Sequence, residues 1–289
     1  MVGARVRFGS ALNYVLLFLV AFTMFYPMYY VLVFSLSDAQ RVGTELLIVP
    51  KGLTFRALEF VLGSRQIQRA YLNTVFLVFV GTFTSILVTG LYAWPLACHV
   101  RGTKLITILT VFTILFSGGF VPMFMVVRMT GLINSLWSLI IPMVINPFYV
   151  ILMIKFFESI PDSLPESAKI DGANDFTVLF RIIIPLSLPA IAAVSLFYAV
   201  NTYWNRFFEA IIYISDPKKH PIQVVLRELL LTQQEEYFEG GASGESAGGV
   251  VGENLRMAVV VVSTVPVLVI YPFVQKYFAK GVMIGAVKG

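Results

Sequence analysis

Six long segments of the sequence contain no Asp, Glu, Lys or Arg, and they restrict the fold more than any other feature. They are Phe8 to Ser37, Ala70 to Cys98, Leu105 to Val127, Met129 to Ile154, Ile182 to Asn205 and Met257 to Gln275. Each is long enough to cross a bilayer, which takes roughly 20 apolar residues. Backbone groups in lipid must pair within a helix or a closed barrel, and these segments are uninterrupted rather than alternating. The sequence therefore predicts six transmembrane helices.

The expected fold class is an all-α polytopic membrane protein, with residues 1–289 forming a single transmembrane domain. A composition of 58% hydrophobic and 13% charged residues agrees with this, because soluble domains carry about twice as much charge. The predicted helices cover about 11–36, 70–98, 105–127, 135–154, 186–205 and 257–275. Between them we expect outer loops at 38–69 and 206–256 and an inner hairpin at 160–185. The first segment is too long for a signal-peptide core, so we expect it to remain.

The distribution of Lys and Arg favours cytoplasmic N- and C-termini, because short loops dominate the positive-inside rule. We interpret the net charge of +5 as part of this topology signal. No basic cluster with interleaved aromatic residues indicates nucleic-acid binding.

The residues that catalysis needs are not grouped in this sequence. It contains no glycine-rich phosphate loop, no nucleophile elbow and no cluster of acid, base or metal ligands, so we expect no enzyme activity and no metal site. The single cysteine, Cys98, excludes an internal disulfide, and we interpret it as a small apolar helix residue. We expect His99 and His220 to be interfacial or solvated. A secondary carrier remains an alternative, but such carriers place ionisable groups inside their helices.

The inner hairpin is a polar segment with several helix signals. Ser163 and Glu166 have the spacing of a capping box, so we expect a short helix to begin there. Gly172 is placed to end that helix in the left-handed conformation. Asn174 or Asp175 can cap a second helix, which we expect Pro185 to end before the fifth membrane helix. The segment predicts a helix, a glycine turn and an amphipathic helix that present small side chains to a partner.

This hairpin resembles the cytoplasmic signature of the permease subunits of bacterial ATP-binding-cassette (ABC) importers, which has Glu-Ala-Ala, a Gly and Ile-x-Leu-Pro at fixed spacing. The chain has Glu166-Ser167-Ala168, Gly172, Ile182 and Ile184-Pro185, with Ser and Ile as mild departures. The resemblance implies a type I importer permease fold, in which this loop docks into a cytosolic ATPase. The residues that it assigns to ATPase coupling are Glu166, Ser167, Ala168, Asp171, Gly172, Ala173 and Pro185.

The C-terminal residues resemble the tail of the second permease subunit of maltose-type importers, which also ends in Gly-x-Val-Lys-Gly. The resemblance implies that this tail, with Gly285, Val287, Lys288 and Gly289, contacts the ATPases; an anchor at the inner membrane surface is the simpler alternative. The stretch Gln275 to Gly285 is similar to permeases for polysaccharide fragments. By that resemblance the cargo is an acidic oligosaccharide such as an alginate or pectin fragment, with neutral oligosaccharides as the alternative.

The resemblance also implies the partners: a homologous second permease subunit, two ATPases that bind ATP and Mg²⁺, and an extracytoplasmic substrate-binding protein. This chain itself would need no cofactor. The outer loop contains a flexible glycine-rich stretch, which either contacts the binding protein or is slack. Its candidate contact residues are Glu239, Gly240, Gly241, Ser243 and Gly244.

Polar and aromatic side chains inside the predicted helices are candidates for the translocation pathway, because such groups usually face the bundle interior or a wet cavity. These candidates are Asn146, Tyr149, Asn201, Tyr203 and Asn205. We assign the neighbouring Trp204 to an aromatic belt at the outer membrane interface.

Overall fold

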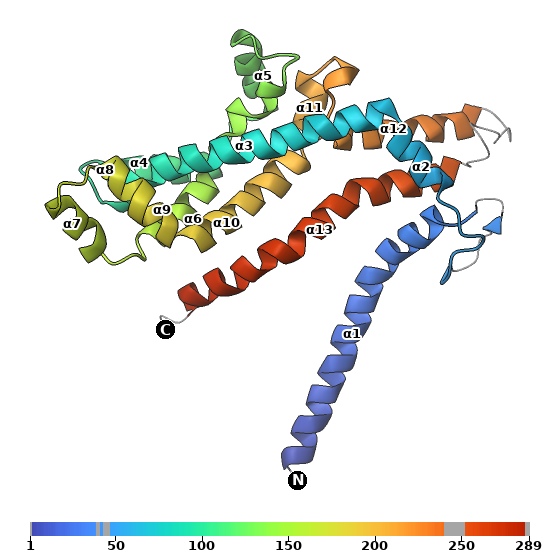
Figure 1. Cartoon of the computed structure of the whole chain (residues 1–289), viewed down its shortest axis with the longest axis horizontal. Coiled ribbons are helices and arrows are strands. Elements are labelled where there is room, and N and C mark those ends of the chain that lie inside the picture. Colours follow the sequence, from blue (N-terminus) through green and yellow to red (C-terminus); the bar gives the residue numbers. More distant parts are fainter. Residues whose placement is uncertain (1, 39–40, 43–46, 240–251, 287–289) are drawn as a thin grey trace. The chain divides into compact units, whose positions relative to one another are not determined.

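The computed structural model describes residues 2–38, 41–42, 47–239 and 252–286, and its regular elements in these ranges are helices, without strands. This confirms the predicted helical class. The chain forms two compact units, shown in the colours of the sequence in Figure 1. Unit 1 comprises Met1–Ile67 and Leu226–Val265, and unit 2 comprises Gln68–Val225 and Pro266–Gly289.

Unit 1 is built on the C-terminal end of helix α1, which spans Val2–Ser35. The amide of Asn254, in the first turn of α13 (Gly252–Ala286), donates to the carbonyl oxygens of Phe34 at 3.2 Å and Ser37 at 2.6 Å. These bonds satisfy carbonyl groups that a helix end leaves unpaired. The unit also contains the short amphipathic helix α2, Arg56–Gly63, which buries Ala57 and Val61.

Unit 2 holds most of the helices and the larger apolar core. Its elements include α3 (Arg65–Ala97), α4 (Thr103–Leu115), α5 (Phe120–Met129), η2 (Leu136–Leu139), η3 (Ile141–Met143), α6 (Pro147–Phe157), α7 (Ser163–Ile170), α8 (Asp175–Val178), η4 (Leu179–Ile183), α9 (Ile184–Leu186), α10 (Leu188–Phe197), η5 (Tyr198–Trp204), α11 (Phe208–Tyr213), η6 (Pro217–Lys219) and the start of α12 (Ile222–Glu239). Two of them, η4 and η5, are π-helices.

Three described helical stretches are long and apolar enough to cross a membrane, namely Leu12–Ser35, Arg65–Ala97 and Glu253–Pro272. Three bent pairs meet the same test together: α4 with α5, η2–η3 with α6, and Asp175–Leu186 with Leu188–Trp204. The number of spans is therefore three, or up to six if each bent pair is one span.

The bent pairs differ from the uninterrupted helices that the sequence predicts. The segment 105–127 breaks at Gly118 and Gly119, where Gly119 has a φ of 81°, and its two halves meet at 113°. The segment 135–154 bends by 49° before Pro147, where the Asn146 side chain accepts from the Phe148 N–H at 3.0 Å and begins α6. Residues that favour turns or helix starts thus interrupt the helices in these segments, although the segments are apolar throughout.

The fifth predicted helix also begins differently. Pro185 lies in the first turn of α9 rather than ending the preceding helix, and the break of 83° falls at Ser187, just before α10. Pro189 occupies the first turn of α10, where its missing N–H costs no hydrogen bond.

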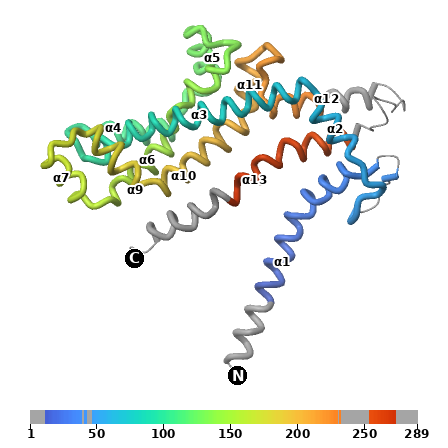
Figure 2. The backbone as a smooth tube through the Cα atoms, in the orientation of Figure 1, coloured from blue at the N-terminus to red at the C-terminus, as the bar shows by residue number. Residues whose placement is uncertain are grey.

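Helix α3 runs beside α10 and η5 along much of its length (Figure 2). Two pairs of hydroxyl groups join them: Ser85 with Tyr203 at 2.7 Å and Thr89 with Tyr198 at 2.8 Å. The Tyr198 hydroxyl also accepts the Asn146 N–H at 2.9 Å, so it links three elements. These bonds satisfy polar groups in the buried core, where an unpaired group would be costly.

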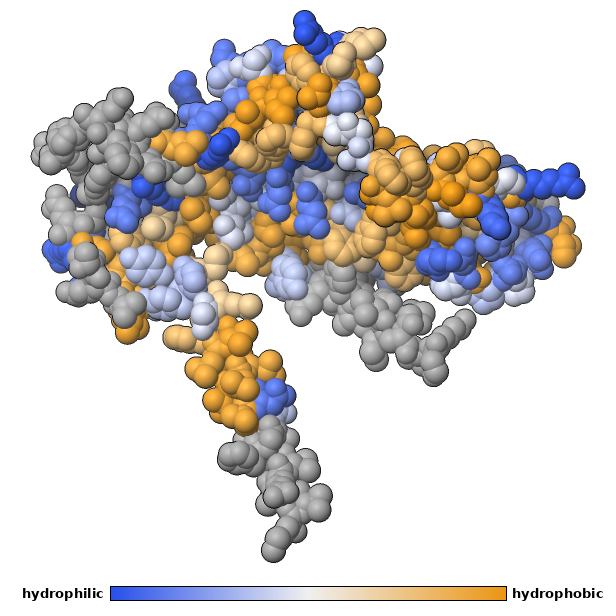
Figure 3. All heavy atoms as spheres, turned by 180° about the vertical axis from the view of Figure 1, so that it is seen from behind, coloured by the Kyte–Doolittle hydropathy of each residue, from blue (hydrophilic) through white to orange (hydrophobic). Residues whose placement is uncertain are grey.

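Much of the exposed surface of the described helices is apolar, as the orange areas of Figure 3 show. Phe79 and Phe83 on α3 and Leu115 on α4 are each more than two-thirds exposed. Such a surface is unusual for a soluble protein and is typical of helices that face lipid tails or partner helices.

Gly81 allows the close approach of α3 and η5, because a Cβ there would lie 2.6 Å from the Tyr203 ring. We predict that Gly81→Ala lowers the stability of the purified protein by about 1–3 kcal/mol through overpacking. Gly90→Ala is the matched control on the same helix, since its Cβ would meet nothing within 4 Å. Thermal unfolding in detergent measures both variants, and equal melting temperatures would contradict the prediction.

Candidate functional site

The hairpin between α6 and α10 has the turn that its sequence predicts. Gly172 has a φ of 87°, its N–H donates to the Lys169 carbonyl at 3.0 Å, and the Ala173 N–H donates to the Ala168 carbonyl at 2.9 Å. Asn174 caps α8 by accepting the Thr177 N–H at 2.8 Å. The predictions of a left-handed glycine and an Asn cap are therefore confirmed.

The start of the hairpin differs from the prediction. Ser163 is the first residue of α7 rather than its cap, and Asp162 precedes it in helical conformation without a side-chain cap bond. The Glu166 N–H donates to the Asp162 carbonyl at 3.1 Å. The predicted capping box is thus wrong, because Asp162 already adopts helical angles and the helix closes its first turn through the backbone.

An ion pair spans the glycine turn and joins the two arms of the hairpin. Lys169 Nζ lies 2.8 Å from Asp175 Oδ1. This hydrogen bond is the main reason why the pKa of Lys169 is raised above its ordinary value. Both side chains are largely exposed, so the pair adds little stability, but with the glycine turn and the Asn174 cap it fixes the arrangement of the two arms.

The predicted coupling residues divide into an outward and an inward set. Glu166, Ser167, Asp171, Gly172 and Pro185 are exposed, whereas Ala168 and Ala173 are half-buried and pack against the core of unit 2. The small side chain of Ala168 thus lets α7 lie close to the core of unit 2, whereas Ser167 remains exposed.

Two apolar side chains complete the outward face of the hairpin. Ile170 is 86% exposed and Phe176 is 66% exposed. Neither residue was assigned to an exposed face from the sequence. The available signal was a large apolar residue beside the glycine turn in an otherwise polar helix.

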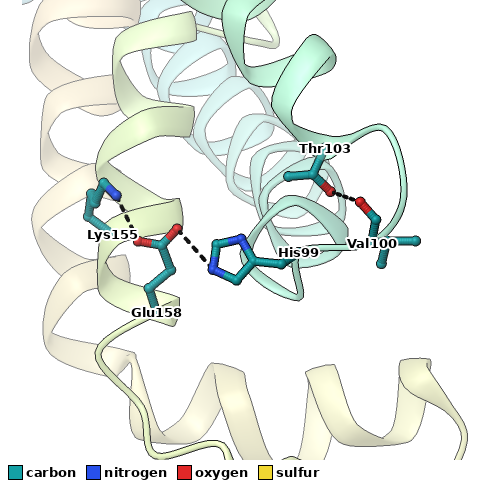
Figure 4. A network of polar contacts seen from close by, with 5 residues as sticks. All are labelled: His99, Val100, Thr103, Lys155 and Glu158. Carbon is teal, nitrogen blue, oxygen red and sulfur yellow. Dashed lines mark hydrogen bonds and ion pairs between the residues drawn. The ribbon is translucent and has the colours of Figure 1, made fainter.

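A small polar network supports the hairpin at the end of α6 (Figure 4). Glu158 accepts a 2.8 Å bond from Lys155 and lies 4.0 Å from His99 Nε2 in the α3–α4 turn. His99 is solvated, as predicted, with its side chain 75% exposed. His220 is instead buried, with Nε2 3.2 Å from the Ile214 carbonyl, so the prediction for that residue is wrong.

A cavity of about 160 Å³ lies between α3, the end of α6 and α7. Its lining includes Trp94, Cys98, Glu158, Asp162, Glu166 and Lys169. Cys98 follows α3 directly and is exposed rather than buried in a helix, which corrects its predicted role.

Partial burial raises the pKa of the Cys98 thiol above its ordinary value of 9.0, while the positive charge of Lys169 acts in the opposite direction. We predict that alkylation of Cys98 is slow at neutral pH and accelerates about tenfold per pH unit to beyond pH 9, because the thiolate reacts. The Lys169→Gln variant should slow the alkylation of Cys98 further at each pH, because it removes the positive charge that favours the thiolate. Monobromobimane kinetics measure the rates, with Ser167→Cys in a Cys98→Ser background as the exposed control. If the pH midpoint of alkylation were lower for Cys98 than for the Ser167→Cys control, the prediction would be contradicted.

The translocation candidates do not form one group. Tyr203 is fully buried, Tyr149 is 7% exposed, and Tyr149 packs edge-to-face on Tyr198 at 4.7 Å. Asn146 caps α6, whereas Asn201 is exposed on η5 and Asn205 is exposed directly after it. We therefore retain these two exposed amides as pathway candidates.

Trp204 does not lie on the surface of the structure, where a residue of the predicted aromatic belt would lie. It is 6% exposed and its ring lies 6.4 Å from that of Tyr71. Among the other predicted contacts, Gly240, Gly241, Ser243, Gly244, Val287, Lys288 and Gly289 lie outside the described residues. Glu239 ends α12 and Gly285 lies near the end of α13, and the surroundings of both side chains are likewise outside the described part.

No protein-family model matches the chain. It is 41% identical over 286 residues to the polygalacturonan/rhamnogalacturonan transport system permease protein YtcP of Bacillus subtilis, covering 98% of this chain and 99% of the relative. It is 26% identical over 271 residues to the arabinooligosaccharides transport system permease protein AraQ of the same organism, covering 91% and 90%.

Among solved structures, the chain resembles one from the crystal structure of a bacterial ABC transporter involved in the import of the acidic polysaccharide alginate. The TM-score is 0.84 and the identity 31%, over 94% of this chain and 97% of the other. The hairpin signature, the helical fold and these similarities lead to one conclusion: the chain belongs to the family of permease proteins of bacterial ABC transport systems for sugars.

Proposed function

We propose that the chain is one of two permease subunits of an importer for acidic polysaccharide fragments in the bacterial cytoplasmic membrane. In this proposal each bent pair is one span, so that six helices cross the membrane and both termini are cytoplasmic. Two cytosolic ATPases bind ATP and Mg²⁺, and an extracytoplasmic binding protein delivers the oligosaccharide. This chain contributes half of the pathway and no catalysis.

The exposed hairpin with its apolar residues is the observation that carries the proposal. Ile170 and Phe176 expose apolar surface beside the charged Glu166, a combination that suits docking into a cleft of another protein. Coupling requires that the ATPases bind this hairpin with different free energies in the inward- and outward-facing conformations. ATP binding then favours the conformation whose hairpin fits the closed ATPase dimer.

The proposed cargo class follows from the similarities. The 41% identical relative is named for polygalacturonan and rhamnogalacturonan, and the similar solved structure is described as an alginate importer. Both names denote polysaccharides with uronic acid units. A neutral oligosaccharide is the second candidate, supported by the 26% identity to the arabinooligosaccharide permease.

Co-purification tests the proposed assembly directly. The chain is expressed with the neighbouring genes of its operon, extracted in detergent, and assayed for ATPase activity with oligogalacturonates, oligoalginates or arabinooligosaccharides and the binding protein. We expect a complex with a second permease and two ATPases, stimulated by the acidic sugars. A chain that purifies alone, with no stimulated ATPase, would overturn the proposal.

The glycine turn yields a prediction about coupling. Proline cannot adopt the φ of 87° at Gly172, so Gly172→Pro should distort the turn. Uptake of the oligosaccharide should then be lost while ATP hydrolysis persists. Glu166→Lys, which reverses an exposed charge on α7, should uncouple similarly. Gly102→Pro is the control, because Gly102 has a φ of 92° in a turn outside the hairpin. Normal uptake in both hairpin variants would rule out this role.

Ile170 yields a prediction about assembly. Ile170→Asp places a charge on a side chain that is 86% exposed, so the subunit should fold normally but bind the ATPases about tenfold more weakly. Val100→Asp is the matched control, an exposed apolar residue in the α3–α4 turn. Binding of purified ATPase to permease in nanodiscs gives both affinities, and equal values would remove Ile170 from the interface.

A further inference from the structure

A buried arginine follows the C-terminal end of η5. The Arg206 side chain is 9% exposed, and its Nη1 donates to Glu209 Oε1 at 2.6 Å. Glu209 lies in the first turn of α11 and its side chain is 19% exposed. One part of the guanidinium is therefore held by a charged partner three residues later.

A second donor of the same guanidinium, Nε, is not satisfied. Arg206 Nε is buried and has no hydrogen-bond acceptor among the described residues. Arginine keeps its proton in proteins, so this donor persists at every accessible pH. A buried charged donor without an acceptor is unfavourable, so a ligand that supplies an acceptor to Nε gains free energy from that contact.

The residues around Arg206 in the sequence have the chemistry that binds sugars. Asn201 on η5 and Asn205 directly after it are exposed, and Phe208 is 47% exposed with its ring 4.6 Å from that of Phe120. Amides bond sugar hydroxyls, and aromatic rings pack on sugar rings. Polar groups near a membrane span generally face the bundle interior or a wet cavity rather than lipid.

We propose that Arg206 binds the carboxylate of a uronic acid unit in the transported oligosaccharide through its Nε–Nη2 edge, while Glu209 holds Nη1. This inference rests on the proposed function and adds a residue that selects the acidic cargo. A planar guanidinium edge matches a carboxylate with two parallel hydrogen bonds, which an uncharged sugar cannot make. Because Nε is buried here, the carboxylate binds in a conformation that exposes it, and its binding favours that conformation.

Direct binding to the complete permease–ATPase complex tests the inference. The probes are fluorescent tetragalacturonate and its carboxyl-reduced counterpart, with and without a non-hydrolysable ATP analogue. The wild type should prefer tetragalacturonate in one of the two states, and Arg206→Gln should weaken its binding about tenfold or more while the reduced probe binds as before. Arg206→Lys keeps the charge without the planar edge and should give an intermediate loss.

Two further variants separate this role from a structural one. Arg206→Gln leaves Glu209 partly buried and unpaired, whereas Arg206→Gln with Glu209→Gln removes both charges and should restore thermal stability. A folded double variant or Arg206→Lys variant that keeps the full preference for tetragalacturonate would overturn the inference. Arg128→Gln, which removes an exposed arginine of α5, controls for net charge and should leave the preference intact.

A parallel ATPase assay distinguishes failure of the inference from failure of the proposed function. If no oligosaccharide stimulates the wild-type complex with its binding protein, the proposed importer function fails and the inference fails with it. If the wild type is stimulated but binds the reduced probe as tightly as tetragalacturonate, only the inference fails. Stimulation together with a preference that depends on Arg206 supports both.

Discussion

The contact between α3 and η5 determines how the rest of unit 2 is arranged. At Gly81 the Tyr203 ring takes the space of a side chain, and one helical turn further along Ser85 bonds the Tyr203 hydroxyl. Thr89 does the same for Tyr198, which also receives the Asn146 N–H. In a segment with few polar groups these bonds fix the relative register of the helices, because any sliding would leave buried hydroxyl groups unpaired.

That contact also gives the π-helix its position. A π-helical turn holds more residues than an α-helical turn, and such turns often occur at functional sites. Here η5 buries Tyr198, Thr202, Tyr203 and Trp204 on one side and exposes Asn201 on the other. The hairpin and Arg206 lie at the two ends of the stretch 163–206, and hydroxyl pairs at Tyr198 and Tyr203 hold this stretch to α3.

The sequence was sufficient to predict features that depend on local chemistry. The charge-free segments indicated membrane helices, Gly172 indicated a left-handed turn, and Asn174 indicated a helix cap, because each depends on a residue and its immediate neighbours. The hairpin spacing also identified the family. The breaks at Gly118, Gly119 and Pro147 were not predicted, because these segments were interpreted as uninterrupted helices and the size of each bend depends on the packing of distant helices.

Other features could not be predicted because they depend on which side of a helix meets which neighbour. The sequence placed Trp204 at the membrane interface, whereas in the structure Tyr71 of α3 lies against it. The sequence placed His220 at an interface or in solvent, whereas in the structure it lies next to the Ile214 carbonyl. The unsatisfied Nε of Arg206 is likewise visible only when every nearby acceptor has a position. The prediction of a capping box was wrong for a local reason, because either Asp162 or Ser163 can begin the helix.

The break at Ser187 has a mechanical consequence. The helical stretches on its two sides meet at 83°, almost a right angle. A displacement of the hairpin along the axis of Asp175–Leu186 therefore reaches α10 as a sideways force and tilts it, with almost no component along the α10 axis. Tilting preserves the register of the hydroxyl pairs with α3, whereas axial sliding would break them. In the proposed importer this corner would convert a push on the hairpin into a change in the angle of α10.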